Sequence, residues 1–350
     1  MSNLVSEKID YLKAGVNRDE ADRLVGRIEK LAKRTHVRLG TRVKSTVGGY
    51  AALFSQSGSA PLIAATTDGV GTKLKLAFRL NVHHTVGIDL VAMSVNDLLC
   101  VGAQPLFFLD YFATGKLDSE QAASVIEGIV EGCSQAGCVL VGGETAEMPD
   151  FYQSGEYDLA GFAVGQVSKN AVLPKKQVLP GDVIIGIGSS GFHSNGYSLL
   201  RKWIPEGESG ESIARKLLTP TKIYVDSCMP LIKRDWVNGL AHITGSGFLN
   251  VPRISSKVSY QIRLPKLSEL PSVFKWVKQV SQLSLGELAQ TFNMGIGMVI
   301  VADKKNEKKI LAQLAKSGEK AWVLGKVVSS RSKVCEVTVA NEDEEVTLKY

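Results

Sequence analysis

The segment Thr66-Thr67-Asp68-Gly69-Val70-Gly71-Thr72-Lys73 joins a short apolar run to a stretch that is typical of a helix from Leu74. It places a carboxylate, two glycines and a lysine in one strand-to-helix turn. Glycines allow backbone amides to approach an oxyanion closely, and a helix start presents free N–H groups to it. Lys73 adds a point charge suited to phosphate, and Asp68 suits Mg²⁺, which accompanies polyphosphates. A tight turn with a solvent-facing salt bridge would use the same residues, and the Walker A pattern is absent.

A second polar group lies within the apolar segment 85–103, which the pattern predicts to be one helix. At about 100° per residue, Asn96 falls nearly beneath Asp89, and Asp97 lies within about 80° of it. The other faces of this helix are apolar, so the carboxylates sit on a mostly buried element. Buried carboxylates must be paired or bound to a metal. We therefore expect either a metal-binding or ligand-orienting pair here, or helix capping and a salt bridge to a neighbouring arginine.

Three later strand-like runs also end in glycine-rich turns. The run 139–141 leads into Gly142-Gly143-Glu144, and residues 242–248 form a third glycine loop. Residues 186–191 match G-x-G-x-x-G, but Glu206, twenty residues on, lies in a loop-like segment and not at the end of a second strand. A nicotinamide site is therefore not favoured. His193 and Asn195 share the loop 191–196 and could bind a polar substrate, although a single histidine is more often a structural hydrogen bonder.

The remaining pattern alternates strands and helices. Helices are predicted at 6–34, 117–136, 215–233 (interrupted by proline) and 304–317, and strands at 105–112, 157–167 and 321–328. Residues 35–46 form a basic arm without apolar periodicity. The charged, proline-containing segment 168–180 is the predicted boundary between domains 1–170 and 171–350.

Bulk properties are those of a globular protein with room for two domains. The chain has 350 residues, 44% of them hydrophobic and 22% charged, with a net charge of +6 and 34 glycines. The basic residues are scattered, which favours anionic small molecules and not nucleic acid. The five cysteines are an odd count without metal-ligand spacing, and Cys133 and Cys138 are five apart, so they do not form C-x-x-C. With no signal sequence and no run of about 18 apolar residues, the expectation is a cytoplasmic protein with free thiols and no membrane contact.

Several long blocks, in order, resemble the phosphoribosylformylglycinamidine cyclo-ligase (aminoimidazole ribonucleotide synthetase) family over nearly the whole chain. The blocks are residues 11–16, 68–74, 87–93, 95–97, 105–116, 142–149, 189–198 and 292–298. The resemblance implies an enzyme that uses ATP and Mg²⁺ to convert formylglycinamidine ribonucleotide into aminoimidazole ribonucleotide in purine biosynthesis. It also implies an α/β (α+β) fold of two domains, the N-terminal one binding ATP and Mg²⁺, and a homodimer whose N-terminal strands form a central β-barrel.

The resemblance also assigns expected roles to individual residues. Asp68 and Asp97 would hold Mg²⁺, and His193 and Asn195 would contact the amidine or formyl group of the substrate. The catalytic set is expected to be Asp68, Lys73, His193 and Asn195, and the nucleotide-binding set Gly69, Gly71, Thr72, Lys73, Asn96, Glu144, Thr244 and Gly245.

The chain departs from the family pattern at its third glycine loop, which is usually Thr-Gly-Gly-Gly. Here it reads Thr244-Gly245-Ser246-Gly247, with a step to Asn250 that is one residue shorter. Ser246 would disfavour a positive φ that glycine allows, and the loop's substrate contact is therefore in question. The alternatives are another ATP-using member of the superfamily, or a non-catalytic nucleotide-binding relative. Absence of a cysteine before Cys100 argues against selenophosphate synthetase.

Overall fold

The computed structural model describes residues 14, 18–37, 39–175, 177–330 and 334–350. Its first domain is built on a five-stranded sheet of order β1-β2-β5-β3-β4. Strands β3 and β4 are parallel, and the other neighbouring pairs are antiparallel. The strands are β1 (Ala52–Ser55), β2 (Leu62–Gly69), β3 (Gln104–Thr114), β4 (Val139–Glu147) and β5 (Tyr157–Val167).

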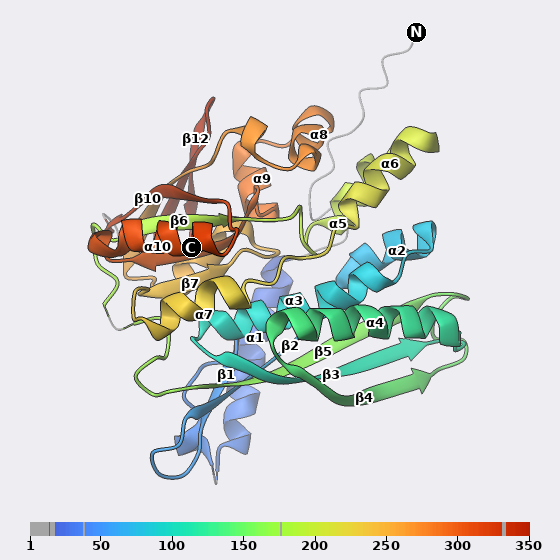
Figure 1. Cartoon of the computed structure of the whole chain (residues 1–350), viewed down its shortest axis with the longest axis horizontal. Coiled ribbons are helices and arrows are strands. Elements are labelled where there is room, and N and C mark those ends of the chain that lie inside the picture. Colours follow the sequence, from blue (N-terminus) through green and yellow to red (C-terminus); the bar gives the residue numbers. More distant parts are fainter. Residues whose placement is uncertain (1–13, 15–17, 38, 176, 331–333) are drawn as a thin grey trace.

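Helices cover one face of this sheet (Figure 1). They are α2 (Leu74–Leu80), α3 (His84–Cys100) and α4 (Ser119–Ala136). Helix α3 is buried along almost its whole length because it lies between the sheet, α4 and the second domain. Its close crossing with α4 requires glycine: a Cβ at Gly87 would lie 2.2 Å from the backbone oxygen of Val125. Asp118 caps α4 by accepting hydrogen bonds from the backbone of Glu120 and Gln121.

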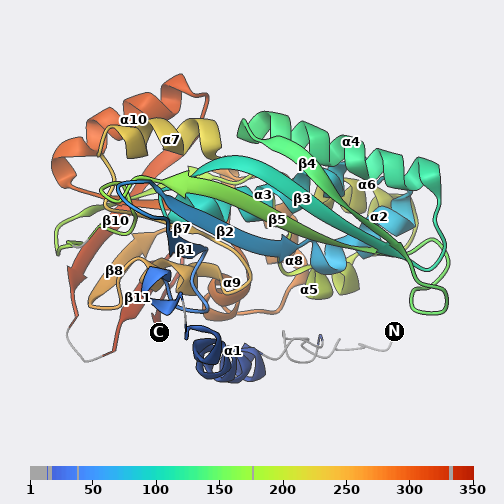
Figure 2. The ribbon, with the colours of Figure 1, turned by 90° about the horizontal axis from the view of Figure 1, so that it is seen from below.

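None of the described helices covers the other face of the first sheet, which Figure 2 views directly. Residues of β5 alternate between buried and accessible, as expected for a strand with one face packed against a core. The uncovered face is apolar, however, and Phe162 at its centre is 43% exposed. Val139 and Val141 on the edge strand β4 are 61% and 57% exposed. We call this face, on which these apolar side chains lie together with the exposed Asp158 and Glu144, the outer face.

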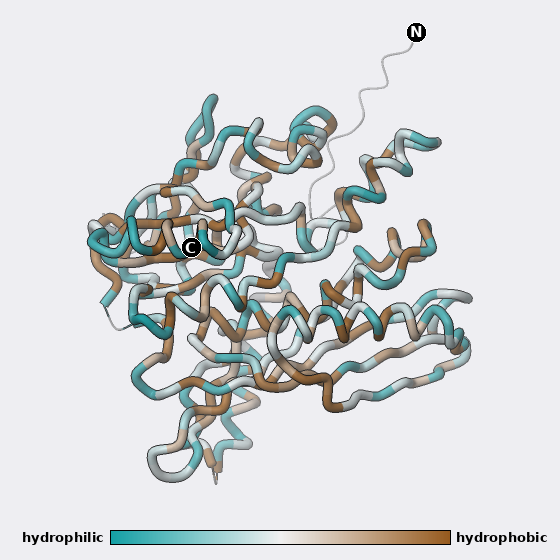
Figure 3. The backbone as a smooth tube through the Cα atoms, viewed as in Figure 1, coloured by the Kyte–Doolittle hydropathy of each residue, from teal (hydrophilic) through white to brown (hydrophobic). Residues whose placement is uncertain are grey.

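The second domain contains a seven-stranded sheet of order β12-β11-β8-β10-β6-β9-β7. Its central strands β6 and β9 are fully buried because structure covers them on both faces, and hydrophobic stretches follow them in Figure 3. The strands are β6 (Val183–Gly188), β7 (Gly239–His242), β8 (Val258–Arg263), β9 (Ile296–Ala302), β10 (Ala321–Ser329), β11 (Glu336–Ala340) and β12 (Glu345–Lys349). The helices are α5 (Tyr197–Trp203), α6 (Gly207–Leu217), α7 (Val225–Lys233), α8 (Ser272–Val280), α9 (Leu285–Thr291) and α10 (Glu307–Lys316).

Several expected elements differ in extent. The predicted helix 6–34 is described only from α1 (Arg18–Ala32) onward, and residues 1–13 and 15–17 lie outside the described part. The basic arm contains two 3₁₀ turns, Lys33–Thr35 and Gly40–Arg42. The predicted helix 215–233 is two helices, α6 and α7, separated by an extended stretch, and Pro230 is accommodated inside α7. Strand β4 was expected to end at residue 141, yet it continues through both glycines because pairing with β3 outweighs their low strand propensity.

Candidate functional site

The two aspartates expected to hold a cation lie together where the first domain meets the second. Asp68 is on β2, and Asp97 is in the last turn of α3. Burial and the negative charge of Asp97 raise the pKa of Asp68 to about 6, against the opposing effects of the Gly69 amide and His242. The Gly69 amide donates a hydrogen bond of 2.8 Å to Asp68 Oδ1. Two carboxylates that repel one another in a partly buried place are a favourable site for a cation, which relieves that repulsion.

His242, the last residue of β7, connects the second domain to this pair of carboxylates. Its Nδ1 donates to Asp97 Oδ1 at 2.9 Å, because a carboxylate can only accept. The ring is completely buried, and its Nε2 has no hydrogen-bond partner among the described residues. Sequence reasoning selected Thr244 and Gly245 from this loop but missed His242. Its position two residues before the glycine loop, opposite an expected metal ligand, is the signal that could have identified it.

The contact predicts that His242 positions Asp97 for a cation. We expect His242→Ala to weaken Mg²⁺ affinity about 10- to 100-fold in the presence of a non-hydrolysable ATP analogue. His242→Asn should retain most of that affinity, because the Asn amide can replace Nδ1 as the donor. Calorimetric titration with Mg²⁺ distinguishes the two variants. Equal losses in both would assign His242 a different role.

Lys73, which the sequence analysis expects to meet phosphate, is bonded to protein groups in this structure. Its ammonium group is completely buried and lies 2.7 Å from Asp89 Oδ2. It also donates to the backbone oxygens of His193 at 2.9 Å and Thr219 at 2.8 Å. Burial lowers the pKa of Lys73, and the charge of Asp89 opposes that shift. With protein oxygens around it, Lys73 holds the two domains together and would have to leave these partners to reach a phosphate.

Asp89 and Asn96 complete this buried polar seam between the domains. Asp89 accepts hydrogen bonds from the Thr221 amide at 2.7 Å and from the Ser194 hydroxyl at 3.0 Å. Asn96 donates to the Lys222 carbonyl at 2.8 Å and accepts from the Tyr224 amide at 3.0 Å. Asn96 is fully buried, and both ends of its amide are bonded to the backbone of the second domain. The sequence allowed either a metal-binding or ligand-orienting pair, or helix capping and a salt bridge to an arginine. The structure shows Asp89 in a salt bridge, and its partner is Lys73.

The loop after β6 brings unpartnered polar atoms to the same junction. His193 adopts a φ of +60° and is completely buried, yet neither ring nitrogen has a hydrogen-bond partner within the described ranges. Burial and the neighbouring His242 lower the pKa of His193 well below its usual value, so its ring is neutral. The rings of His193 and His242 are 6.3 Å apart. The side-chain nitrogens of Asn195 and Asn250 are likewise buried without partners in the described chain. Buried polar atoms are normally bonded, so this cluster indicates a ligand site.

The third glycine loop adjoins this cluster. The Thr244 amide donates to Asn250 Oδ1 at 2.8 Å, and a Cβ added at Gly245 would lie 3.3 Å from Asn195 Oδ1. Ser246 has a φ of −102°, which serine adopts without strain. The positive φ of this loop, +54°, falls on Gly247. The concern that Ser246 would disturb the loop is therefore not supported by its backbone geometry.

The glycine turn predicted to meet phosphate, residues 69–72, and Glu144 lie in different surroundings. Gly71, with a φ of +68°, and Thr72 are exposed directly after β2, where the turn can meet a ligand. Glu144 is exposed on the outer face, because Gly143 next to it faces Asp110 on the helix-covered side. The register aligns Asp68, Gly161, Asp110 and Gly143 in one row. Three strand spacings, roughly 14 Å, therefore separate Glu144 from Asp68 within one chain, and the structure does not bring these two predicted site residues together.

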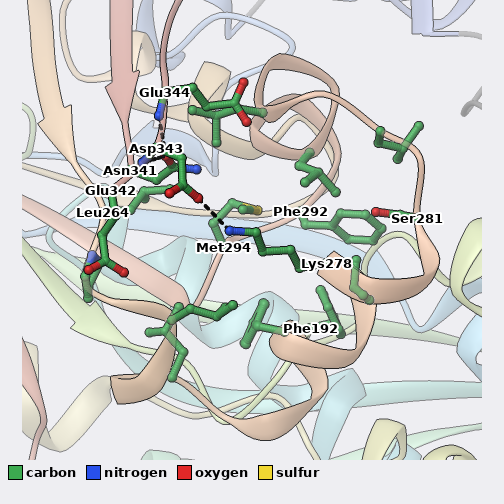
Figure 4. A pocket seen from close by; sticks show the side chains of 18 residues that line it. Phe192, Leu264, Lys278, Ser281, Phe292, Met294, Asn341, Glu342, Asp343 and Glu344 are labelled. Atoms are coloured by element: carbon green, nitrogen blue, oxygen red, sulfur yellow. Dashed lines mark hydrogen bonds and ion pairs between the residues drawn. The ribbon is translucent and has the colours of Figure 1, made fainter.

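A separate cavity of about 230 Å³ lies in the second domain beside the loop 191–196 (Figure 4). Phe192, the neighbour of His193, forms part of its wall together with Phe292 and Met294. The ion pair between Lys278 and Asp343, 2.7 Å long, lies at its edge. Its lining contains neither Asp68 nor Asp97, so this cavity is distinct from the polar cluster.

No three His, Cys, Asp or Glu side chains within the described ranges gather as a metal site. The two carboxylates of Asp68 and Asp97 are enough for Mg²⁺, because this ion commonly binds one or two protein carboxylates and completes its shell with phosphates and water. No helix in the described part of the chain has the length and apolar character needed to span a bilayer.

Known proteins resemble the chain in sequence and in fold. Residues 48–167 match the family described as AIR synthase related protein, N-terminal domain, and residues 180–338 match the corresponding C-terminal domain. The fold resembles T. maritima PurL complexed with ATP, with a TM-score of 0.60, 16% identity, and coverage of 90% of this chain and 48% of the other. It also resembles AaThiL complexed with AMPPCP and TMP, with a TM-score of 0.62, 17% identity, and coverage of 93% and 96%.

Curated relatives are identical to this chain at about half of the aligned positions. Phosphoribosylformylglycinamidine cyclo-ligase of Thermoanaerobacter pseudethanolicus is 50% identical over 341 residues, which cover 93% of this chain and 99% of the relative. The enzyme of the same name from Cupriavidus pinatubonensis is 48% identical over 329 residues, covering 91% and 93%. Since identity at this level extends through both domains, the chain belongs to the phosphoribosylformylglycinamidine cyclo-ligase family.

Proposed function

We propose that the chain catalyses the ATP-dependent ring closure of formylglycinamidine ribonucleotide to aminoimidazole ribonucleotide, with release of ADP and phosphate. The observation that carries this proposal is the junction where Asp68 and Asp97 lie beside buried nitrogens of His193, Asn195 and His242 that lack partners in the described chain. Such a junction can hold a metal-bound polyphosphate next to a polar substrate.

The chemistry requires an amide oxygen to become a leaving group. Transfer of the γ-phosphoryl group of ATP to that oxygen gives an iminophosphate, from which phosphate departs as the amidine nitrogen attacks the same carbon. Little covalent chemistry is left for the protein, so positioning and charge neutralisation supply most of the rate enhancement. Backbone amides at Gly71 and Thr72 would bind phosphate oxygens, whereas the Gly69 amide would first have to leave Asp68 Oδ1. His193 and Asn195 would orient the amidine or formyl group.

Mg²⁺ fits the donor set of this junction. Asp68 and Asp97 would hold it through carboxylate oxygens, and when bound it would neutralise the charge of the polyphosphate. Lys73 acts indirectly in this scheme: by binding the His193 carbonyl it fixes the loop that carries His193 and Asn195. Thr244 and Gly245 lie against Asn250 and Asn195, and we place them beside the substrate.

A coupled assay tests the proposal. ADP release should depend on formylglycinamidine ribonucleotide, and the product should have the mass of aminoimidazole ribonucleotide. Binding of ATP without substrate-dependent ADP release would instead favour a non-catalytic nucleotide-binding relative. Substrate-dependent ADP release with a different product mass would favour another ATP-using member of the superfamily.

We further propose that the outer face of the first sheet pairs with a second copy, so that residues 1–170 form the dimerisation and ATP-binding domain and residues 171–350 the C-terminal domain. The supporting observation is a face with exposed Phe162, Val139 and Val141 that no helix in the described part of the chain covers. A contiguous exposed apolar surface of this kind marks an interaction site. A role for Glu144 in nucleotide binding then requires the second copy, because it lies on this face. With five free cysteines, the dimer would operate in the reducing cytoplasm.

Phe162→Glu is expected to shift the protein from dimer to monomer, because it places a charge at the centre of the proposed interface. Light scattering coupled to size-exclusion chromatography measures the mass. Val130→Glu is the matched control: Val130 is 52% exposed on α4, on the helix-covered side, and its replacement should leave the dimer intact. A wild-type protein that is monomeric at micromolar concentration would overturn this part of the proposal.

A further inference from the structure

The end of helix α4 brings two cysteines together. The Cys138 amide donates to the Cys133 carbonyl at 3.0 Å, and the Gly137 amide donates to the Ser134 carbonyl at 3.1 Å. Gly137 has a φ of +60°. These bonds define a Schellman motif, in which the two residues joined by the outer of the two hydrogen bonds, here Cys133 and Cys138, contact one another through their side chains. In most proteins that contact is hydrophobic, but here it consists of two thiols, Cys133 and Cys138.

The two thiols differ in environment. Cys133 is 3% exposed, whereas Cys138 is partly accessible to solvent. Both are free, and the interaction between their side chains shifts the pKa of each thiol. Cys138 lies on the helix-covered side of the sheet: Leu140, two residues on, pairs with the buried Phe108. A second copy on the outer face would therefore leave Cys138 open to small molecules.

We propose that Cys133 and Cys138 form a reversible dithiol–disulfide pair, in which Cys138 reacts first with a low-molecular-weight disulfide and Cys133 resolves the product. The Cys138 thiolate attacks one sulfur of the small disulfide, forming a mixed disulfide and releasing one small thiolate. Cys133 then loses its proton and attacks the Cys138 sulfur, which releases the second small thiol. Two protein thiols are oxidised, and one small disulfide is reduced to two thiols.

The electrostatics agree with this order of reaction. The interaction with the Cys133 side chain lowers the pKa of the Cys138 thiol, which favours the nucleophilic thiolate. The same interaction is the largest cause that raises the pKa of Cys133. Once the Cys138 sulfur is part of a mixed disulfide it is no longer a thiolate, so this cause disappears and Cys133 becomes easier to ionise. A partly exposed thiol of lowered pKa beside a second thiol is the arrangement of redox-sensitive cysteines.

The other three cysteines provide internal references. Cys100 and Cys228 are completely or almost completely buried, and burial raises the pKa of the Cys100 thiol well above its usual value. Cys335 is 3% exposed, and burial raises its pKa to about 11. These thiols should remain reduced when the Cys133–Cys138 pair is oxidised.

The experiment exposes the full-length protein to buffers with increasing ratios of oxidised to reduced glutathione. In the wild type we expect the loss of two hydrogen masses, mapped to the peptide that contains Cys133 and Cys138, through a single two-electron transition that dithiothreitol reverses. This measurement uses only the wild-type protein, so it tests disulfide formation even if a cysteine variant folds poorly. A stable glutathione adduct on wild-type Cys138, or no oxidation of this peptide, would overturn the proposal.

Serine variants assign the order of reaction. Cys133→Ser should accumulate a mixed disulfide at Cys138, because the resolving thiol is gone. Cys138→Ser should react with glutathione disulfide at least about tenfold more slowly at position 133, because a buried, less ionised thiol is left. Cys335→Ser should match the wild type. Accumulation of the adduct at Cys133 in the Cys138→Ser protein at the wild-type rate would reverse the assigned order and contradict the proposal.

Discussion

Replacing Asp68 with Asn is expected to abolish ATP-dependent ring closure while the protein stays folded. The substitution preserves shape but removes one of the two carboxylates available for Mg²⁺, so the charge of the polyphosphate is no longer neutralised. We expect turnover to fall by about a thousandfold or more. ADP release with formylglycinamidine ribonucleotide measures the loss, and circular dichroism verifies the fold. Near-normal turnover would remove Asp68 from the metal site.

Asp158→Asn is the matched control for this substitution. Asp158 lies on the neighbouring strand β5 and accepts a 2.9 Å hydrogen bond from the Leu159 amide, the same local contact that Asp68 makes with Gly69. It is exposed on the outer face, away from Asp97. Its replacement should therefore change turnover by less than about threefold, since no metal ligand is lost.

Asp68→Asn should also stabilise the metal-free protein above pH 6. The pKa of Asp68 is raised from 3.8 to about 6 in the folded state, so its charged form opposes folding. The loss of unfolding free energy is absent below the pKa that Asp68 has in the unfolded chain, which is 3.8. It grows as the pH rises and reaches its full size above about pH 6. We expect a gain on the order of 2 kcal/mol at pH 8 and about half of that at pH 5. Urea titration at the two pH values measures it, and an equal gain at both would refute the assigned cause.

The second large effect is expected at Asp89, whose replacement by Ala leaves Lys73 charged and buried without its partner. Both side chains of this pair are 0% exposed. Removing one member of a buried ion pair typically costs about 3–5 kcal/mol, because the remaining charge is uncompensated. Urea denaturation should show this loss of unfolding free energy. The double variant Lys73→Met with Asp89→Leu should recover a large part of it, since neither charge is then buried.

An exposed ion pair of the same composition is the control for Asp89. Lys278 and Asp343 also lie 2.7 Å apart, but their side chains are 57% and 66% exposed. Asp343→Ala should change the unfolding free energy by about 0.5 kcal/mol or less, because solvent screens the pair. A loss at Asp89 no larger than the loss at Asp343 would contradict the role of the buried seam.

The local sequence pattern was sufficient to predict elements whose length or alternation of apolar residues is visible in consecutive residues. The alternating residues of β5 were predicted at their observed bounds because burial of one face imposes a period of two, and the apolar stretch that became α3 is too long for a strand. The turn predicted at 66–73 is shorter than expected, because strand β2 continues through Asp68 and Gly69. The extension of β4 through Gly142 and Gly143 was not predicted, since pairing with β3 is a long-range interaction that local propensity does not contain.

Site residues were harder to predict because their roles depend on partners far apart in the sequence. A lysine beside glycines indicated phosphate binding, yet the burial of Lys73 is decided by Asp89 and by carbonyls of the second domain. Strand order, which the sequence does not state, separates Glu144 from Asp68. His242 was missed because its contact with Asp97 spans 145 positions.

The most direct test of the central claim, that Asp68 and Asp97 hold one metal-bound nucleotide, is a double-mutant cycle on nucleotide affinity. The affinity of a non-hydrolysable ATP analogue is measured by calorimetry, with and without Mg²⁺, for Asp68→Asn, Asp97→Asn and the double variant. If both carboxylates bind one ion, each single variant should lose nearly the whole Mg²⁺-dependent affinity, and the double variant should lose little more. Losses that add in the double variant, or an affinity that Mg²⁺ does not change in the wild type, would contradict the account.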